Sequence, residues 1–148
     1  MRRLALLGLL GTLSSACDPA EACEENVGAQ SLDERVELVL ADQTVSAELA
    51  DDAVERERGW RKRACNREAI LLVPDQPDAL AVWGCELVDP IDVIGLRDGA
   101  VVFVERLDPC EAPCGGCPTV GEDVIVDGIL EVLPDALRVE VGSPVDWP

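Results

Sequence analysis

Two short alternating stretches, separated by a turn, constrain the fold of this chain more than any other feature. In residues 36–40 and again in 45–49, apolar side chains occupy every second position. Successive side chains of a β-strand point to opposite faces, so a period of two predicts half-buried strands rather than helices. Ala41-Asp42-Gln43 lies between the two stretches and suits a hairpin turn. We therefore predict that the folded part begins with a β-hairpin.

Further short apolar runs follow, and turn-forming residues separate them. The predicted strands are 69–73, 80–83, 88–96, 100–106 and 124–132, and Arg97-Asp98-Gly99 is a further hairpin turn. Residues 139–142 are expected to close the domain. Asp52, with Glu55 three positions later, resembles the start of a capped helix, which we predict over residues 52–63. Many short strands and little helix predict a mainly β fold, a small barrel-like sheet with one or two short helices.

The composition excludes several classes of function. The chain has 148 residues, a net charge of −18, and neither His nor Tyr. Catalysis by Ser-His-Asp or Cys-His groups is therefore excluded. A strongly acidic protein repels polyphosphate backbones, so we expect no nucleic-acid partner. No cofactor or metal is expected, and the protein is interpreted as a non-enzymatic one.

The amino terminus resembles an export signal. Met1-Arg2-Arg3 is followed by an apolar run over residues 4–13, which is too short to span a bilayer, and Ser14-Ser15-Ala16 precede Cys17. The sequence Leu13-Ser14-Ser15-Ala16-Cys17 resembles a bacterial lipobox, although Ser14 stands where Leu is usual. We therefore expect a lipid on Cys17 and a lipid-anchored location in the bacterial cell envelope, in a leaflet that the sequence does not identify.

This reading divides the chain into three parts. Residues 1–16 form the signal peptide of a lipoprotein, residues 17–34 form an acidic tether without bases, and residues 35–148 form one β-rich domain. An ordinary signal peptide, with Cys17 as a plain disulfide cysteine, is the alternative.

Six further cysteines lie beyond Cys17, and an even number outside the cytosol favours disulfides. They are Cys23, Cys65, Cys85, Cys110, Cys114 and Cys117. The loop from Cys110 to Cys117 has the spacing C-x3-C-x2-C, so a thiol-redox centre or a structural metal site is the alternative there. Acidic surroundings raise the pKa of a thiol, which disfavours the redox alternative.

Bases gather around the predicted helix. They are Arg56, Arg58, Arg61, Lys62, Arg63 and Arg67. A small anion could bind such a patch, and small-anion binding is a second alternative function. The simpler interpretation is a solvated helix face whose bases pair with the protein's own carboxylates.

Several motifs together resemble a known family, the domain of unknown function 192, over about residues 36–145. The run Val45–Gly59 resembles the family's opening strand and helix, and Trp83, Pro90, Asp92 and Val93 fall on its W-x6-P-x-D-I motif. Residues 97–102 and 129–132 resemble its later turn and strand. The resemblance implies a β-rich, barrel-like, often exported domain with no established activity. Gly84-Cys85-Glu86 replace the family's M-K-N, the segment we would expect to contact a ligand.

The resemblance also bears on the cysteines and on the ligand-facing positions. Many members carry a P-C…C-P loop, which implies a bridge between Cys110 and Cys117. Cys65 and Cys85 are absent from the usual pattern, so a bridge between them is our hypothesis, and Cys23 with Cys114 remains as the third pair.

Trp83 and Asp92 are the candidate ligand-facing positions. A carboxylate pair of Asp92 and Glu131 for acid–base work is the alternative, although Asp92 is expected to face solvent or to accept backbone hydrogen bonds. From the sequence, the protein is an envelope lipoprotein with a binding or accessory role and an unknown ligand or protein partner.

Overall fold

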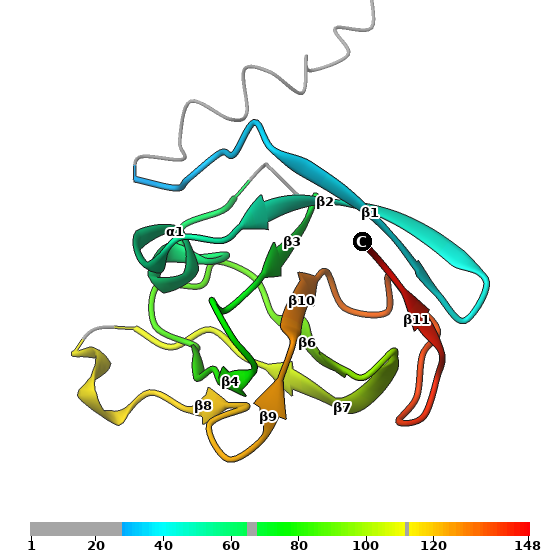
Figure 1. Ribbon diagram of the computed structural model, residues 1–148. Coiled ribbons are helices and arrows are strands. Elements are labelled where there is room, and N and C mark those ends of the chain that lie inside the picture. Colours follow the sequence, from blue (N-terminus) through cyan, green and yellow to red (C-terminus); the bar gives the residue numbers. More distant parts are fainter. Residues whose placement is uncertain (1–27, 65–67, 112) are drawn as a thin grey trace, which may run out of the picture.

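The computed structural model describes residues 28–64, 68–111 and 113–148 (Figure 1). The main strands are β1 (Arg35–Leu40), β2 (Gln43–Ala50), β3 (Ala69–Leu72), β6 (Ile91–Arg97), β7 (Ala100–Leu107), β10 (Gly128–Val132) and β11 (Val145–Asp146). Short strands lie between them: β4 (Asp78–Ala79), β5 (Val82–Trp83), β8 (Thr119–Val120) and β9 (Ile125–Val126). One α-helix, α1 (Ala53–Arg58), and a 3-10 turn, η2 (Cys114–Gly116), complete the described elements.

The seven main strands form one sheet that curls into a nearly closed barrel. Their order is β11-β1-β2-β3-β10-β6-β7, and only the β2–β3 pairing is parallel. The two ends of the sheet meet through backbone hydrogen bonds near the starts of β7 and β11. The Val101 N–H donates to the Ser143 carbonyl (2.9 Å), and the Val145 N–H donates to the Gly99 carbonyl (2.8 Å). The predicted fold class, mainly β and barrel-like with a short helix, is confirmed.

One face of the sheet points into the barrel and forms an apolar core. All seven strands contribute to it, with these buried side chains: Leu38, Leu40, Ala47, Ala69, Leu71, Ile94, Leu96, Val101, Leu130, Val132 and Val145. No buried charged side chain of the described residues belongs to this cluster. The barrel interior therefore supplies apolar burial on folding, the main driving force for a fold of this kind.

A second core lies on the outer face of β3, β10, β6 and β7. Helix α1 and the short strands cover that face (Figure 1), and its buried residues are Ala50, Trp60, Ile70, Leu72, Val82, Leu87, Ile91, Val93, Phe103, Leu107, Val126 and Ile129. The central strand β10 is buried on both faces, because its alternate residues serve the two cores. A register shift in the β6–β7 pairing at Gly95/Leu96 lets Val101 face the interior while Phe103 faces outward.

Helix α1 begins as the sequence predicts and ends earlier than predicted. The Asp52 carboxylate accepts hydrogen bonds from the N–H groups of Val54 and Glu55, both at 2.8 Å, which is an N-cap. We predicted a helix to residue 63, but it ends at Arg58, because Gly59 adopts φ +43° and ψ −135°, outside the helical region. The Gln30 side chain donates to the Gly59 carbonyl and to the Glu55 carbonyl, which also accepts the Gly59 N–H.

Two other local predictions have clear outcomes. Asp98-Gly99 forms the β6–β7 turn with positive φ at both residues, as the sequence indicated. Residues 139–142, expected to close the domain, lie in turn and irregular structure, and the closing element is β11. Gly142 has φ +91°, so the chain turns there before it pairs with β1.

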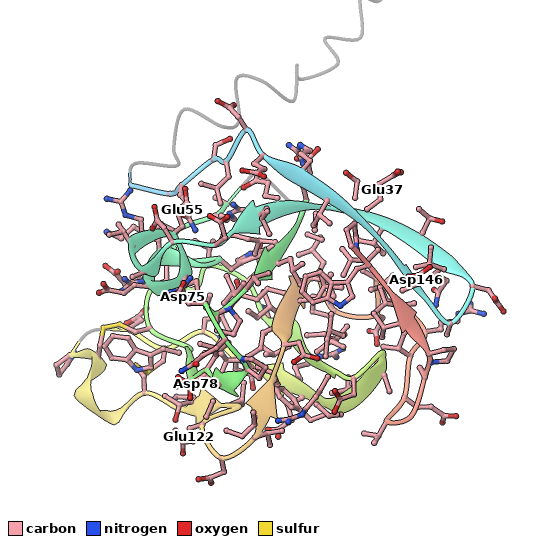
Figure 2. The ribbon with its side chains drawn as sticks, viewed as in Figure 1. Glu37, Glu55, Asp75, Asp78, Glu122 and Asp146 are labelled. Carbon is pink, nitrogen blue, oxygen red and sulfur yellow. A yellow bond between two sulfur atoms is a disulfide. The ribbon has the colours of Figure 1, made fainter. Side chains whose placement is uncertain are left out.

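Acidic side chains are spread around the described surface, as the labelled residues of Figure 2 show. Among the described residues, no helix is long and apolar enough to cross a membrane.

Candidate functional site

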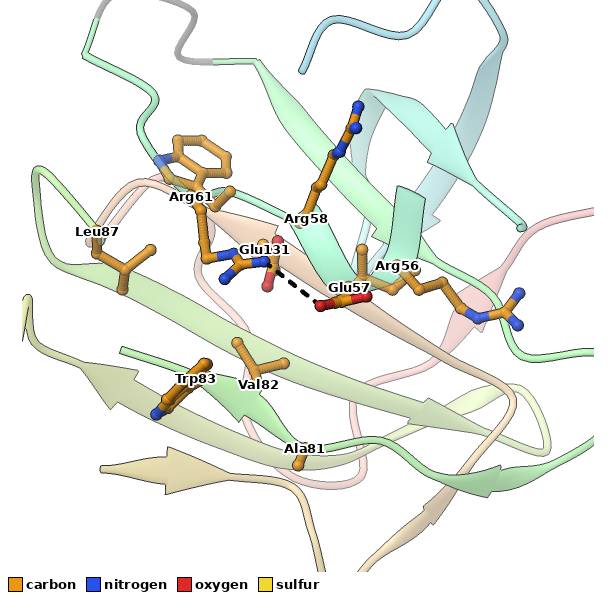
Figure 3. A pocket seen from close by; sticks show the side chains of 12 residues that line it. Arg56, Glu57, Arg58, Arg61, Ala81, Val82, Trp83, Leu87 and Glu131 are labelled. Carbon is orange, nitrogen blue, oxygen red and sulfur yellow. Dashed lines mark ion pairs between the residues drawn. The ribbon is translucent and has the colours of Figure 1, made fainter. Parts of the chain in front are cut away.

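A pocket opens between helix α1 and strand β5, on the outer face of the sheet (Figure 3). Its volume is about 130 Å³, and its wall combines arginines with apolar side chains. The lining residues are Arg56, Glu57, Arg58, Gly59, Trp60, Arg61, Leu72, Ala81, Val82, Trp83, Leu87 and Glu131. Most of the charged ones come from α1 and the turn after it, and the helix end at Gly59 lies close to Glu131 of β10.

Glu131 is the charged residue at the inner end of this pocket. It lies in β10 opposite Ile70 of β3, and Ile70 in turn lies opposite Glu48 of β2. Residues paired across neighbouring strands share one face of a sheet, so Glu48, Ile70 and Glu131 form a row on the outer face. Both carboxylates are buried, at 0% exposure for Glu48 and 2% for Glu131. A buried row of this kind requires compensating charge.

Arg63 supplies that charge. It is 1% exposed, its Nη2 pairs with Glu48 Oε2, and its guanidinium lies 5.4 Å from the centroid of the Trp60 ring. It also acts electrostatically on Glu131 and lowers the pKa of that carboxyl. Glu48 has further partners, Arg35 at 3.9 Å and the Leu32 N–H at 3.1 Å. Glu48, Arg63 and Glu131 are named the ionic cluster below.

Glu131 is only partly satisfied within this cluster. The backbone N–H of Trp60 donates a hydrogen bond to its carboxyl, but the buried Oε2 has no hydrogen-bond partner among the described residues. Burial raises the pKa of Glu131 to about 7, because desolvation outweighs Arg63 and Trp60. An unpartnered polar atom at the inner end of a cavity is the kind of group that a ligand satisfies.

Gly59 permits the close approach of the helix end to Glu131. A Cβ at this position would lie 3.1 Å from Glu131 Oε2 and 3.3 Å from Oε1. Its positive φ is also a conformation that side chains rarely adopt. The glycine that terminates α1 therefore leaves room for the pocket as well.

Most of the predicted basic patch pairs with the protein's own carboxylates. Arg56 donates to the Val73 carbonyl (2.9 Å) and to Asp75 (3.4 Å), and Lys62 pairs with Glu86 (3.2 Å). Arg67 lies outside the described residues. The simpler interpretation of the patch is therefore largely correct.

Two arginines at the pocket differ from the rest of the patch. Arg61 makes only long ion pairs, 3.9 Å to Glu57 and 3.7 Å to Glu86, and Figure 3 shows the first of these beside the Glu131 carboxyl. Arg58 is exposed and has no ion-pair or hydrogen-bond partner among the described residues. Arg58 and Arg61 therefore remain available to an external anion.

The two predicted ligand-facing residues lie in different places. Trp83 lines the pocket and is 37% exposed. Asp92 does not line it: its carboxylate accepts hydrogen bonds from Arg106 Nε (2.8 Å) and Nη2 (3.2 Å) and from the Asp135 N–H (2.8 Å). Asp92 also lies opposite Val132 rather than Glu131, so the two carboxylates occupy opposite faces of the sheet and cannot act as a pair.

Four of the predicted disulfide cysteines converge in one place. The Cys110–Cys117 bridge is present, with Cα atoms 5.6 Å apart. The hypotheses of Cys65–Cys85 and Cys23–Cys114 bridges are wrong, because Cys85 bonds to Cys114, with Cα atoms 5.4 Å apart. An isolated β-bridge pairs the backbones of Cys85 and Cys110, and this pairing brings the C-x3-C-x2-C loop against Cys85. Cys17, Cys23 and Cys65 lie outside the described residues.

The ionic cluster contains the residues that the sequence analysis underestimated. Glu48 occupies a polar position in an alternating strand, so the pattern places it on a face that a barrel leaves to solvent. Its burial follows from the second layer, which no local pattern reveals. The available signal was Glu131, a single carboxylate within an apolar run.

The comparisons with known proteins concern the fold and the family. A search of proteins with curated function found no match. A crystal structure of a protein of unknown function from Novosphingobium aromaticivorans is similar, with a TM-score of 0.61, 19% identity, and coverage of 76% of this chain and 84% of that one.

A second similar crystal structure is described as a "putative transcription regulator" from Sinorhizobium meliloti. Its TM-score is 0.60, with 21% identity and coverage of 77% of this chain and 92% of that one. At these identities, both similarities show the fold alone. The profile of the domain of unknown function 192, a family described as "Uncharacterized ACR", matches residues 36–147. Because that match spans most of the chain, the protein belongs to the domain of unknown function 192 family.

Proposed function

We propose that this protein is a lipid-anchored protein of the bacterial cell envelope whose domain binds a small molecule without transforming it. The observation that carries the binding role is Glu131 Oε2, which is buried, unpartnered and placed at the inner end of the pocket. The pocket also offers an exposed arginine, Arg58, and the indole of Trp83. A few polar groups converging on a partly apolar cavity are typical of a ligand site.

A binding role is preferred to catalysis for chemical reasons. The chain has no His, and Glu48, the buried carboxylate in the same row as Glu131, pairs with Arg63. The other carboxylate of that row, Glu105 beyond Val93, is exposed and does not line the pocket. A thiol-redox role remains the alternative, and the proximity of the sulfur atoms of Cys85, Cys114 and Cys117, within 4.8 Å of one another, is the observation in its favour. Both disulfides are formed in the structure, which favours a structural role for them.

The binding role is tested by a thermal-shift screen of small metabolites on the domain, with wild type and Ala81→Phe compared. Ala81 lines the pocket, so the larger side chain fills it without changing a charge. A ligand that binds only the folded state raises the Tm, and one present at 100 times its Kd stabilises by about 2.7 kcal/mol. The proposal is abandoned if every stabilising compound acts equally on both proteins.

The lipid anchor is tested separately, because it rests on sequence alone. Cells expressing the full chain are fed an alkyne fatty acid, and the purified protein is examined for label. We expect label and membrane association in the wild type, and the loss of both in Cys17→Ser. Unlabelled wild-type protein in the soluble fraction would contradict the anchor, but it would not bear on the proposed binding role of the pocket.

A further inference from the structure

The chemical class of the ligand follows from which charges surround the unpartnered oxygen. Glu131 is packed beneath α1 and its following turn, which contribute Glu57, Arg58 and Arg61 to the pocket wall, together with Arg56. Arg63, in the segment between α1 and β3, also acts on it. In its row on the sheet lie Glu48 beyond Ile70, which Arg63 neutralises, and the exposed Glu105 beyond Val93. The residues of β3 and β5 that line the pocket, Leu72, Val82 and Trp83, carry no charge. The wall therefore has an excess of positive charge.

Building on the proposed function, we infer that the pocket binds a small oxoanion, a carboxylate or a phosphate group. Arg58 and Arg61 pair with it at the rim, and Glu131, as a carboxylic acid, donates a hydrogen bond to it at the inner end. Arg56, Arg61 and Arg63 are paired with carboxylates, whereas Arg58, unpaired among the described residues, carries its positive charge at the rim. That charge repels an amine, so a cationic ligand is disfavoured. Guanidinium groups match carboxylate and phosphate oxygens geometrically, and such charge-assisted bonds are roughly twice as strong as neutral ones.

The bonding state of Glu131 agrees with this assignment. An ionised carboxylate only accepts hydrogen bonds, and it would repel a bound anion. A protonated one carries an O–H that needs an acceptor, and an oxoanion oxygen is an acceptor. The desolvation of Glu131 favours its neutral form. Binding of an anion beside it favours that form further, so binding takes up a proton from solution.

The size of the pocket limits the ligand. Its volume is about 130 Å³, which is room for a small molecule and not for a macromolecule. The pocket is open to solvent and Trp83 is 37% exposed, so the oxoanion group can lie inside while the rest of a ligand extends past Trp83. A free metabolite and the headgroup of an anionic lipid share this chemistry, and the experiment distinguishes them.

Sulfate and acetate are suitable probes, because neither changes its charge between pH 6 and 8.5. Tryptophan fluorescence reports binding, since Trp83 and Trp60 line the pocket. With the pKa of Glu131 at about 7, the protonated fraction falls by a factor of roughly 30 between pH 6 and 8.5, and the apparent affinity falls with it. Glu131→Gln keeps a donor and no charge, so it should bind at both pH values with the affinity of the wild type at pH 6.

Arginine variants test the rim. We expect Arg58→Ala to weaken sulfate binding about tenfold or more at every pH, at unchanged Tm, because the side chain is exposed and unpaired. Arg138→Ala is the matched control, since Arg138 bonds to the Gln43 side chain through its own backbone and does not line the pocket. Phosphatidylglycerol vesicles, with phosphatidylcholine vesicles as the uncharged comparison, test whether the oxoanion comes from a lipid headgroup. A headgroup is identified if the protein binds the anionic vesicles, loses that binding in Arg58→Ala, and is displaced from them by sulfate.

Two results would overturn the inference. A cationic compound from the metabolite screen whose affinity rises with pH and disappears in Glu131→Gln would show that the pocket takes a basic ligand, and the proposed binding role would stand. The absence of any saturable, Arg58-dependent response to sulfate, acetate or anionic vesicles at pH 6 would exclude an oxoanion. The binding role itself would then depend on whether the metabolite screen finds a ligand sensitive to Ala81→Phe.

Discussion

The two faces of the barrel wall have opposite chemistry, although the same strands build them. On β10, Leu130 and Val132 enter the apolar interior, while Ile129 and Glu131 face the outer layer. The interior holds apolar side chains, and the outer layer encloses the ionic cluster and the pocket. Buried charge is costly and contributes little net stability, whereas apolar burial is the main stabilising term. The interior therefore maintains the fold, and the outer layer is where a specific function is expected.

Removal of Arg63 should have the largest effect. Arg63→Ala removes the buried ion-pair partner of Glu48 and the cation that lowers the pKa of Glu131. Breaking a buried pair in this way costs about 3–5 kcal/mol, measured by urea unfolding. Arg35→Ala is the matched control: Arg35 also approaches Glu48, at 3.9 Å, but is 40% exposed, so its removal should cost at most about 1 kcal/mol. Equal losses in the two variants would mean that the ionic cluster is not a buried unit.

Truncation of the interior should separate stability from binding. Leu130→Ala deletes a fully buried side chain at the centre of the sheet, which costs about 2–5 kcal/mol. Because Leu130 points away from the pocket, the Kd of any pocket ligand should remain within a factor of two or so at temperatures where the variant is folded. A tenfold loss of affinity would show that the two faces are not independent.

Titration of Glu131 should make the outer layer sensitive to pH. Its folded-state pKa, about 7, lies above the ordinary value of 4.5. The folded state therefore binds this proton more tightly, and its contribution to stability is full below pH 4.5 and lost as pH rises through 7. Relative to Glu131→Gln, the wild type should lose roughly 2–3 kcal/mol between pH 5 and 8. Chemical denaturation of both proteins at the two pH values measures this difference, and parallel behaviour would contradict it.

Replacement of Gly59 should lower stability by a smaller amount and should also crowd Glu131 in the pocket. Gly59→Ala places a Cβ about 3.1 Å from Glu131 Oε2 and imposes φ +43° on a residue with a side chain. Strain of this kind costs about 1–3 kcal/mol. Gly142→Ala, where φ is also positive but no atom lies within 4 Å of the added Cβ, isolates the backbone part. If the two variants lose the same stability, the contact with Glu131 is negligible.

Local patterns predicted the parts of this fold that local physics determines. Alternation identified β1 and β2, and Asp52 identified the start of α1, because side-chain direction and capping act within a few residues. The early end of the helix could also have been predicted from Gly59. The pairing of Cys85 with Cys114 could not be predicted from local sequence, because it depends on a backbone pairing that brings distant loops together.

The candidate site was predicted least well, for a related reason. Trp83 and the basic segment were identified. Asp92 does not line the pocket; it pairs with Arg106 and accepts a hydrogen bond from the Asp135 N–H, in line with the expectation that it accepts backbone hydrogen bonds. The apolar run 91–96 serves both cores, so no alternation there shows which face Asp92 occupies. Glu48 and Arg63 have the sequence pattern of exposed residues. They are buried only because a second layer folds back over the barrel, which is a tertiary effect.

The state of Glu131 is central to this account, and carbon-13 NMR of its side-chain carboxyl tests it most directly, with Glu131→Gln used for assignment. The account predicts a titration midpoint near pH 7 in the free protein and an upward shift on addition of sulfate, as the anion favours the protonated acid. A midpoint near 4.5, unchanged by sulfate, would mean that Glu131 is solvated and ionised, and the pocket would lose its central group.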